Sequence, residues 1–160
     1  MGLDRIDVAI LRYLQNDGRM ANKALARAVG LAPSSCLARV RRLIDDGVIS
    51  RFGITLDRPQ LGFGLEAMIA VRLNRHARDD IDQMIAHLSD LDETVSITHV
   101  AGATDLLVHV AVRDSDHLRD LVMDAFTTRS EVERFETSLI YSRLDLHGPI
   151  ASSVTTPTPS

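Results

Sequence analysis

Apolar residues along the first third of the chain recur at three- and four-residue spacing, which predicts amphipathic helices. In residues 3–18 the apolar stripe consists of Ile6, Ala9, Ile10, Tyr13 and Leu14. Asp4 is a candidate N-cap, with a second acid, Asp7, three residues later. Gly18 then stands at a position where helices commonly end. We therefore predict a first helix over this segment.

Two shorter helices are predicted next, over residues 22–29 and 33–46. Asn22 is the candidate cap of the first, and Gly30 ends it. Pro33 opens the second at the first-turn position, where the missing N–H of proline costs nothing. Two helices joined by a short glycine-containing turn form a helix-turn-helix unit, whose second helix enters the major groove of DNA.

The hydrophobic period changes to two after Gly47, where Val48, Ser50, Phe52, Ile54 and Leu56 alternate with other residues. This alternation predicts two short strands or a wing-like hairpin. The stretch PQLGFG, residues 59–64, contains proline and glycine and is interpreted as a hinge. We therefore predict a winged helix-turn-helix domain over residues 1–58, followed by this hinge.

The remainder of the chain alternates between strand and helix patterns. Strand-like alternation marks residues 65–73, 94–100, 106–112 and 135–146, and helical stripes lie around 81–88 and 118–125. The order βαββαβ predicts an α+β ferredoxin-like domain over residues 65–147, with both helices on one face of an antiparallel sheet. The other face of the sheet is left bare, which favours dimerisation. Residues 148–160 are rich in Pro, Ser and Thr and are predicted to be disordered.

Charge divides along the same boundary. Residues 1–58 hold ten Lys or Arg and six Asp or Glu, a net of +4, whereas residues 59–160 hold eight and sixteen, a net of −8. The basic first third and acidic remainder indicate two domains with different partners. A lone cysteine, Cys36, excludes an intrachain disulfide. With neither a signal-peptide pattern nor a membrane-spanning apolar run, we expect a soluble cytoplasmic protein with no membrane partner.

The third predicted helix carries chemistry suited to DNA. Cys36, Val40 and Leu43 share one face at 100° per residue, so that face packs inward. The opposite side carries small residues near the helix start, which let the backbone approach base edges, and arginines, which bind phosphate or guanine. Arg39 lies beside the buried face and is expected to reach a phosphate. The alternative is a solvated basic face with no DNA contact.

Three stretches take the interpretation further: LDRIDVAILRYLQNDGR, LARAVGLAPSSCLARVRRLIDDGVI and TLDRPQLG. Together they resemble the DNA-binding domain of the Lrp/AsnC (leucine-responsive, feast/famine) family of transcription regulators, and the second half is similar to that family's amino-acid-sensing domain. The resemblance covers residues 3–145 and implies binding of double-stranded DNA. One departure is Ala32, where the family usually has a serine cap; its loss costs about 1 kcal/mol. The predicted DNA-binding residues are Asn22, Lys23, Pro33, Ser34, Ser35, Ala38, Arg39, Arg41 and Arg42.

The resemblance also implies an effector site. In the family, amino acids bind near the turn between the second and third strands, at an interface between dimers, and this turn typically reads Gly-Asp-Tyr-Asp. The matching residues here are Gly102, Ala103, Thr104 and Asp105, and with His99 they form the predicted effector-binding set. Backbone N–H groups at the glycine turn would hold a carboxylate, and Asp105 an ammonium. The alternative is that Gly102 serves only a tight turn and Asp105 only caps a strand.

The remaining candidates favour no further chemistry. His99 and His109 lie on predicted strands without Cys or Glu at ligand spacing, so we expect neither a metal nor another cofactor. Cys36, on the apolar face of its helix, is interpreted as a core thiol and not a redox switch. The sequence shows no nucleophile–base pair and no phosphate loop, which argues against an enzyme.

We therefore expect a sequence-specific transcriptional regulator whose DNA binding or assembly responds to a small effector, an amino acid. The family resemblance further implies a homodimer that assembles into a higher oligomer, often an octamer. The alternative function is an architectural DNA-compacting protein with no effector.

Overall fold

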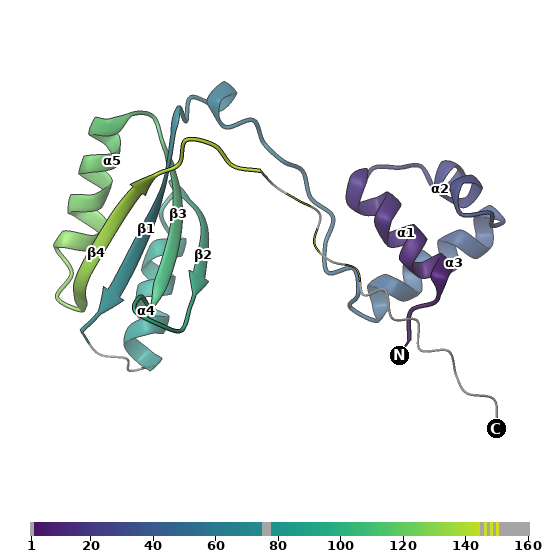
Figure 1. Cartoon of the computed structure of the whole chain (residues 1–160), viewed down its shortest axis with the longest axis horizontal. Coiled ribbons are helices and arrows are strands. Elements are labelled where there is room, and N and C mark those ends of the chain that lie inside the picture. Colours follow the sequence, from purple (N-terminus) through teal and green to yellow (C-terminus); the bar gives the residue numbers. More distant parts are fainter. Residues whose placement is uncertain (1, 75–77, 145, 147, 149, 151–160) are drawn as a thin grey trace. The chain divides into compact units, whose positions relative to one another are not determined.

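The computed structural model describes residues 2–74, 78–144, 146, 148 and 150, and the chain divides into two compact units. The first is built on the residues up to Thr55 and the second spans Leu56–Leu144 (Figure 1). The predicted hinge, residues 59–64, falls at the start of the second unit and contains one 3-10 turn, η1 (Pro59–Leu61). Of the tail predicted to be disordered, residues 149 and 151–160 lie outside the described residues.

Among its described residues, the first unit contains three helices: α1 (Arg5–Asn16), α2 (Asn22–Ala28) and α3 (Pro33–Asp45). Asp4 caps α1 as predicted, because its Oδ1 accepts hydrogen bonds from the backbone N–H groups of Ile6 and Asp7 at 2.9 and 2.8 Å. Asp7 Oδ2 in turn accepts from the N–H of Asp4 at 3.1 Å, which completes a capping box. The predicted apolar faces pack together, and the fully or nearly buried members are Ile10, Leu25, Ala26, Cys36 and Leu43.

The cap predicted for α2 is wrong. Ala21 is the N-cap and makes no side-chain cap, while Asn22 is the first helical residue. The Asn22 side chain instead donates a hydrogen bond from Nδ2 to the carbonyl of Pro33 at 2.8 Å. Asn22 therefore ties the start of α2 to the start of α3.

The two short strands predicted from the alternation after Gly47 are also wrong. Residues 50–57 form neither helix nor strand, and they leave Phe52, Ile54 and Leu56 exposed at 51%, 77% and 53%. A strand needs a partner to satisfy its backbone hydrogen bonds, and no segment of the described chain pairs with this one. The alternation therefore marks an extended segment with one apolar face and no sheet around it.

The second unit has the predicted βαββαβ order. Its elements are β1 (Leu65–Leu73), α4 (Arg78–Ser89), β2 (Thr94–His99), β3 (Leu106–Val112), α5 (Ser115–Val122) with the π-turn η2 (Met123–Thr127), and β4 (Val132–Leu139). The sheet is antiparallel in the order β2-β3-β1-β4, and α4 and α5 cover one of its faces (Figure 1). The fold is therefore α+β, as predicted.

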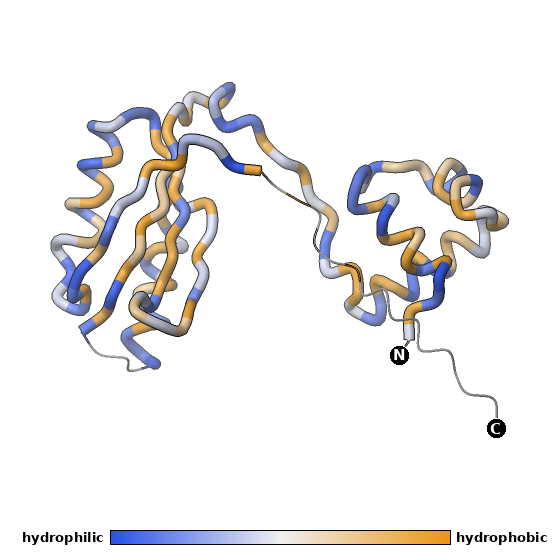
Figure 2. Tube along the Cα trace, viewed as in Figure 1, coloured by the Kyte–Doolittle hydropathy of each residue, from blue (hydrophilic) through white to orange (hydrophobic). Residues whose placement is uncertain are grey.

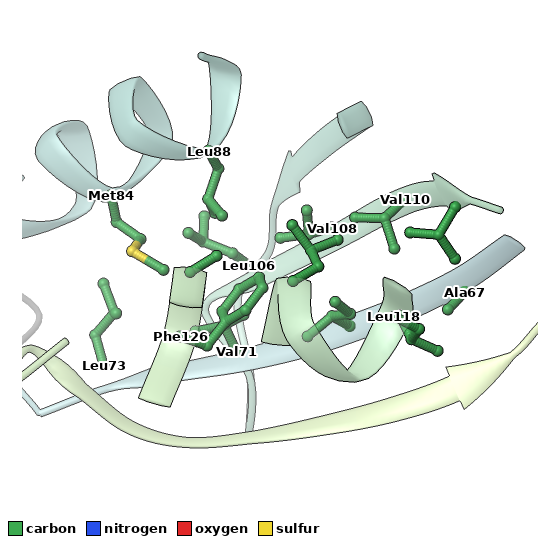
Figure 3. Close-up of a cluster of buried hydrophobic side chains, with 14 of the residues drawn as sticks. Ala67, Val71, Leu73, Met84, Leu88, Leu106, Val108, Val110, Leu118 and Phe126 are labelled. Atoms are coloured by element: carbon green, nitrogen blue, oxygen red, sulfur yellow. The ribbon is translucent and has the colours of Figure 1, made fainter. Parts of the chain in front are cut away.

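The core of this unit lies between the sheet and its helices. Alternate residues of β1 and β3, among them Val71 and Val108, meet Met84, Leu88 and Phe126 from the helical layer (Figure 3). Hydrophobic residues concentrate along these two central strands, as Figure 2 shows. Within the described residues, no helix is long and apolar enough to cross a membrane.

The opposite face of the sheet carries a mixture of apolar and charged side chains. The register pairs Met68 with His109 and Ala70 with Leu107, so these four residues share that face. Met68, Ala70 and Leu107 are half-buried, and no helix of the second unit lies over them. This is the face that the sequence predicts to be left bare.

Candidate DNA-binding and effector-binding sites

Helix α3 presents two faces of different character. Cys36 and Leu43 are fully buried against the rest of the first unit, as the helical period predicts. The exposed side carries the small residues Ser34, Ser35 and Ala38, all within the first two turns. Pro33 occupies the first helical position, and a helix start with exposed small side chains is a shape that can approach base edges closely.

Two of the three arginines on α3 are bound to acids of α1. Arg39 Nη1 contacts Asp4 Oδ2 and lies 2.9 Å from Asp7 Oδ1. Arg42 Nη2 lies 2.6 Å from Asp7 Oδ2, so each carboxylate oxygen of Asp7 holds one guanidinium. Arg39 was expected to contact a DNA phosphate. In this structure its guanidinium instead binds the carboxylates of Asp4 and Asp7.

Of the groups in these ion pairs, Asp7 is far more buried than the two arginines. Asp7 is 1% exposed, whereas the side chains of Arg39 and Arg42 are 28% and 42% exposed. The hydrogen bond from the Asp7 N–H, together with Arg39, holds the pKa of Asp4 below its ordinary value. Hydrogen bonds to Asp4 and Asp7 raise the pKa of Arg39 in turn.

Arg41 differs from its two neighbours. It is exposed, and it makes no ion pair with any residue that the structure describes. Lys23 is likewise exposed, in the first turn of α2. The sequence did not predict that Asp4 and Asp7 pair with Arg39 and Arg42. Both acids stand at the start of a helix, where capping alone is enough to explain them.

The turn predicted to bind the effector joins β2 to β3 and is bonded to β1. Gly102 has φ +141°, a conformation that favours glycine. Asp105 is 7% exposed, and its N–H donates to the carbonyl of Val71 while its Oδ2 accepts from the N–H of Leu73, both at 2.9 Å. Arg72 Nη1 donates to the carbonyl of Gly102 at 3.0 Å. The turn is therefore held in place from the neighbouring strand.

A cavity of about 610 Å³ lies beside this turn. It is lined by Arg72, Ile81, His99, Val100, Ala101, Gly102 and Asp105. Three of the five predicted effector residues thus share one cavity. Thr104 lines a second cavity of about 260 Å³, which Arg72 also lines, and Ala103 lines neither cavity. Arg72 was not predicted, because strand alternation does not show which charged residue lies near a distant turn.

The strand histidine His109 has partners on both ring nitrogens. Nε2 lies 2.6 Å from Glu66 Oε2, and Nδ1 lies 3.0 Å from Arg143 Nη1. His109 is 2% exposed, which fits the interpretation of a satisfied strand histidine. Within the described ranges, no three His, Cys, Asp or Glu side chains are grouped so as to hold a metal ion.

Comparison with known families divides the chain in the same way as the fold. Residues 3–50 match winged helix-turn-helix DNA-binding domains, and residues 66–150 match the Lrp/AsnC ligand binding domain.

Individual relatives agree. The HTH-type transcriptional regulator AldR of Mycolicibacterium smegmatis is 42% identical over 148 residues, covering 92% of this chain and 86% of the relative. The leucine-responsive regulatory protein of Escherichia coli is 38% identical over 120 residues, 75% of this chain and 73% of the relative.

Among solved structures, a transcriptional regulator from Neisseria meningitidis in complex with L-Met superposes with a TM-score of 0.85. The two are 28% identical, and the match covers 93% of this chain and 96% of that one.

The fold and the comparisons define a transcription regulator with a DNA-binding unit and a separate ligand-binding unit. The chain belongs to the Lrp/AsnC family. The relatives named here are transcriptional regulators, which is consistent with the prediction that the chain is not an enzyme.

Proposed function

We propose that this regulator binds specific DNA sites through α3 and that a free α-amino acid, bound beside the 101–105 turn, controls its DNA binding or assembly. The observation that carries the effector proposal is the lining of the 610 Å³ cavity, in which Arg72 and Asp105 supply opposite charges. A zwitterionic amino acid matches this pair, because a carboxylate binds a guanidinium and an ammonium binds a carboxylate. Ile81, Val100 and Ala101 offer apolar surface for a side chain.

The chemistry of the cavity also limits where the ammonium can bind. Asp105 Oδ2 accepts from the Leu73 N–H at 2.9 Å, so a bound ammonium would share this carboxylate with the backbone of β1. Thr104 lines the second cavity, which shares Arg72 with the first, and its side chain is smaller than the tyrosine that the family has there, so the ligand need not be leucine. The Neisseria relative, crystallised with L-Met, supports methionine as one ligand to test.

Calorimetry of the purified protein against the common L-amino acids tests the effector proposal. We expect at least one to bind, and Arg72→Gln to weaken that binding at least tenfold. A matched control is Arg78→Gln, which removes a 93% exposed guanidinium on α4. If no amino acid binds the parent protein, or if Arg72→Gln binds it as tightly as the parent does, the proposed effector site is wrong.

For DNA binding, we assign the contacts in the major groove to Ser34, Ser35, Ala38 and Arg41. We place Asn22, Lys23 and Pro33 beside the sugar-phosphate backbone of the DNA. Exposure of small side chains at the start of α3 supports this assignment. Footprinting on selected genomic fragments tests it: discrete protected sites are expected, whereas uniform coverage would favour an architectural DNA-compacting protein.

Assembly is part of the same proposal. Two recognition helices read half-sites about one helical turn apart, which requires at least a dimer. The half-buried apolar residues on the uncovered sheet face supply a surface for it, and we propose that dimers assemble further into a higher oligomer such as an octamer.

A further inference from the structure

Asp7, a buried acid on α1, forms ion pairs with two of the arginines on α3. Asp7 projects from α1 and is 1% exposed, and its two carboxylate oxygens bind Arg39 and Arg42 at 2.9 and 2.6 Å. Oδ2 also accepts a hydrogen bond from the N–H of Asp4 at 3.1 Å. Asp7 therefore joins the start of α1 to successive turns of the recognition helix.

This arrangement changes which cations of α3 are available to DNA. A guanidinium bound to a buried carboxylate is fixed in position, because moving away to follow a phosphate would leave the carboxylate buried without a partner. Arg41, by contrast, is exposed and has no ion pair among the described residues. The helix therefore presents one arginine without an ion pair among the described residues and two that are held in place by acids.

Phosphate contacts are blind to sequence, and they supply nearly all of the affinity for random DNA. Two additional mobile arginines beside the groove would raise the affinity for every duplex, whether or not it contains the specific site. Holding them on α1 leaves discrimination to Arg41 and to the small residues that face the bases.

We propose that Asp7 is a positioning residue that sets DNA specificity without touching DNA: it keeps Arg39 and Arg42 in the frame of the domain and away from the phosphate backbone. The inference rests on the proposed placement of α3 in the groove.

The test compares the full-length parent with Asp7→Asn, which removes the charge and keeps the shape. Affinity is measured by fluorescence anisotropy over a range of salt concentrations, for a duplex selected from bound genomic fragments and for a random duplex of equal length. We expect Asp7→Asn to bind random DNA several-fold more tightly and to discriminate several-fold less between the two duplexes. The salt slope should steepen by up to about 0.9 for each released arginine that gains a phosphate.

Asp46→Asn is the matched control, because it removes an exposed acid from the C-cap of α3, the helix that carries both arginines. It should leave the salt slope unchanged. If Asp7 served stability alone, Asp7→Asn would lower the melting temperature and weaken both duplexes in proportion at an unchanged slope, and the proposal would be overturned.

A second variant covers the case in which Asp7→Asn fails to fold. The triple substitution Asp7→Asn, Arg39→Gln and Arg42→Gln removes the buried carboxylate together with the two partly exposed guanidinium groups that pair with it, which is less costly than removing one partner. The parental salt slope is expected, because neither arginine touches phosphate in the parent; a shallower slope would overturn the proposal. If the parent shows no preference for any selected duplex, the proposed DNA-binding function is what fails.

Discussion

The backbone N–H of Leu73 donates to Asp105 Oδ2 at 2.9 Å, which binds the end of the effector turn to the neighbouring strand β1. The N–H of Asp105 donates in the opposite direction, to the carbonyl of Val71, also at 2.9 Å. Asp105 thus performs the framework role that was the alternative interpretation of this residue, whether or not it also contacts a ligand.

Asp105→Ala is therefore expected to lower the free energy of unfolding of the second unit. A buried hydrogen bond to a charged acceptor contributes about 1.5–3 kcal/mol, and its loss leaves the Leu73 N–H unsatisfied. Urea unfolding of the parent and the variant measures the difference. Asp90→Ala, at an exposed residue after α4, is the control and should cost less than 0.5 kcal/mol. Equal stability of Asp105→Ala and the parent would refute the framework role.

Arg41→Ala is expected to weaken DNA binding and to reduce its salt dependence. If Arg41 binds one phosphate in each half-site, the slope of log K against log salt falls by about 0.9 per protomer. Arg12→Ala removes an exposed arginine from α1 and serves as the control. A lower affinity at an unchanged slope would instead place Arg41 on a base. Affinity equal to that of the parent would show that the DNA-facing side of α3 is wrongly assigned.

The sequence predicted those features that depend on residues close to one another in the chain. The capping box of Asp4 and Asp7 and the apolar face containing Cys36 follow from residues within one or two turns of each other. The βαββαβ order follows from the change of hydrophobic period, because a strand buries every second residue whereas a helix buries every third or fourth.

Contacts between distant segments could not be predicted in this way. The hydrogen bond from Asn22 to Pro33 and the ion pairs of Asp7 join different helices, and no periodicity records them. The segment around Ile54 alternates like a strand, but a strand exists only where a partner supplies the hydrogen bonds. Arg72 lies near Gly102 because β1 and β3 are adjacent in the sheet, which the sequence does not show.

Acid should destabilise the first unit through Asp4. Its pKa in the folded protein lies below the ordinary value of 3.8, so the ionised carboxylate stabilises the fold. This contribution is fully present above the unfolded pKa and is lost as the pH falls through the lower, folded one. Asp4→Asn retains a good N-cap without the charge. We expect it to lower the Tm at pH 6, and the difference from the parent to shrink as the pH falls below 3.8, in melts followed by circular dichroism. A Tm difference that persists unchanged at pH 2 would contradict this assignment.

Cys36 should be inert in the folded protein. Its side chain is fully buried, and burial raises the pKa of the thiol, so little reactive thiolate forms near neutral pH. We expect negligible modification by a thiol-specific chromogenic reagent at pH 7.5, and one thiol per chain after unfolding in guanidinium chloride. Rapid reaction of the native protein would favour the redox-switch alternative.

The uncovered face of the sheet should hold protomers together. Met68, Ala70 and Leu107 lie side by side on β1 and β3 with their side chains half-buried in the single chain. A face of this kind is stabilised when a second copy removes it from water, at about 25 cal/mol per Å² of apolar area. Light scattering at micromolar concentration is therefore expected to give a mass of at least twice the 17.6 kDa of one chain.

Leu107→Glu tests whether this face is the one that pairs. A carboxylate at the centre of a paired sheet face would be buried without a partner, which costs several kcal/mol and should shift the protein toward monomer. Ala86→Glu introduces the same charge on the exposed side of α4 and should leave the mass unchanged. Loss of the dimer should also weaken binding to two-half-site DNA while leaving the circular dichroism spectrum intact. If Leu107→Glu retains the parental mass, dimerisation uses another surface, and the exposed residues Phe52 and Ile54 become the next to substitute.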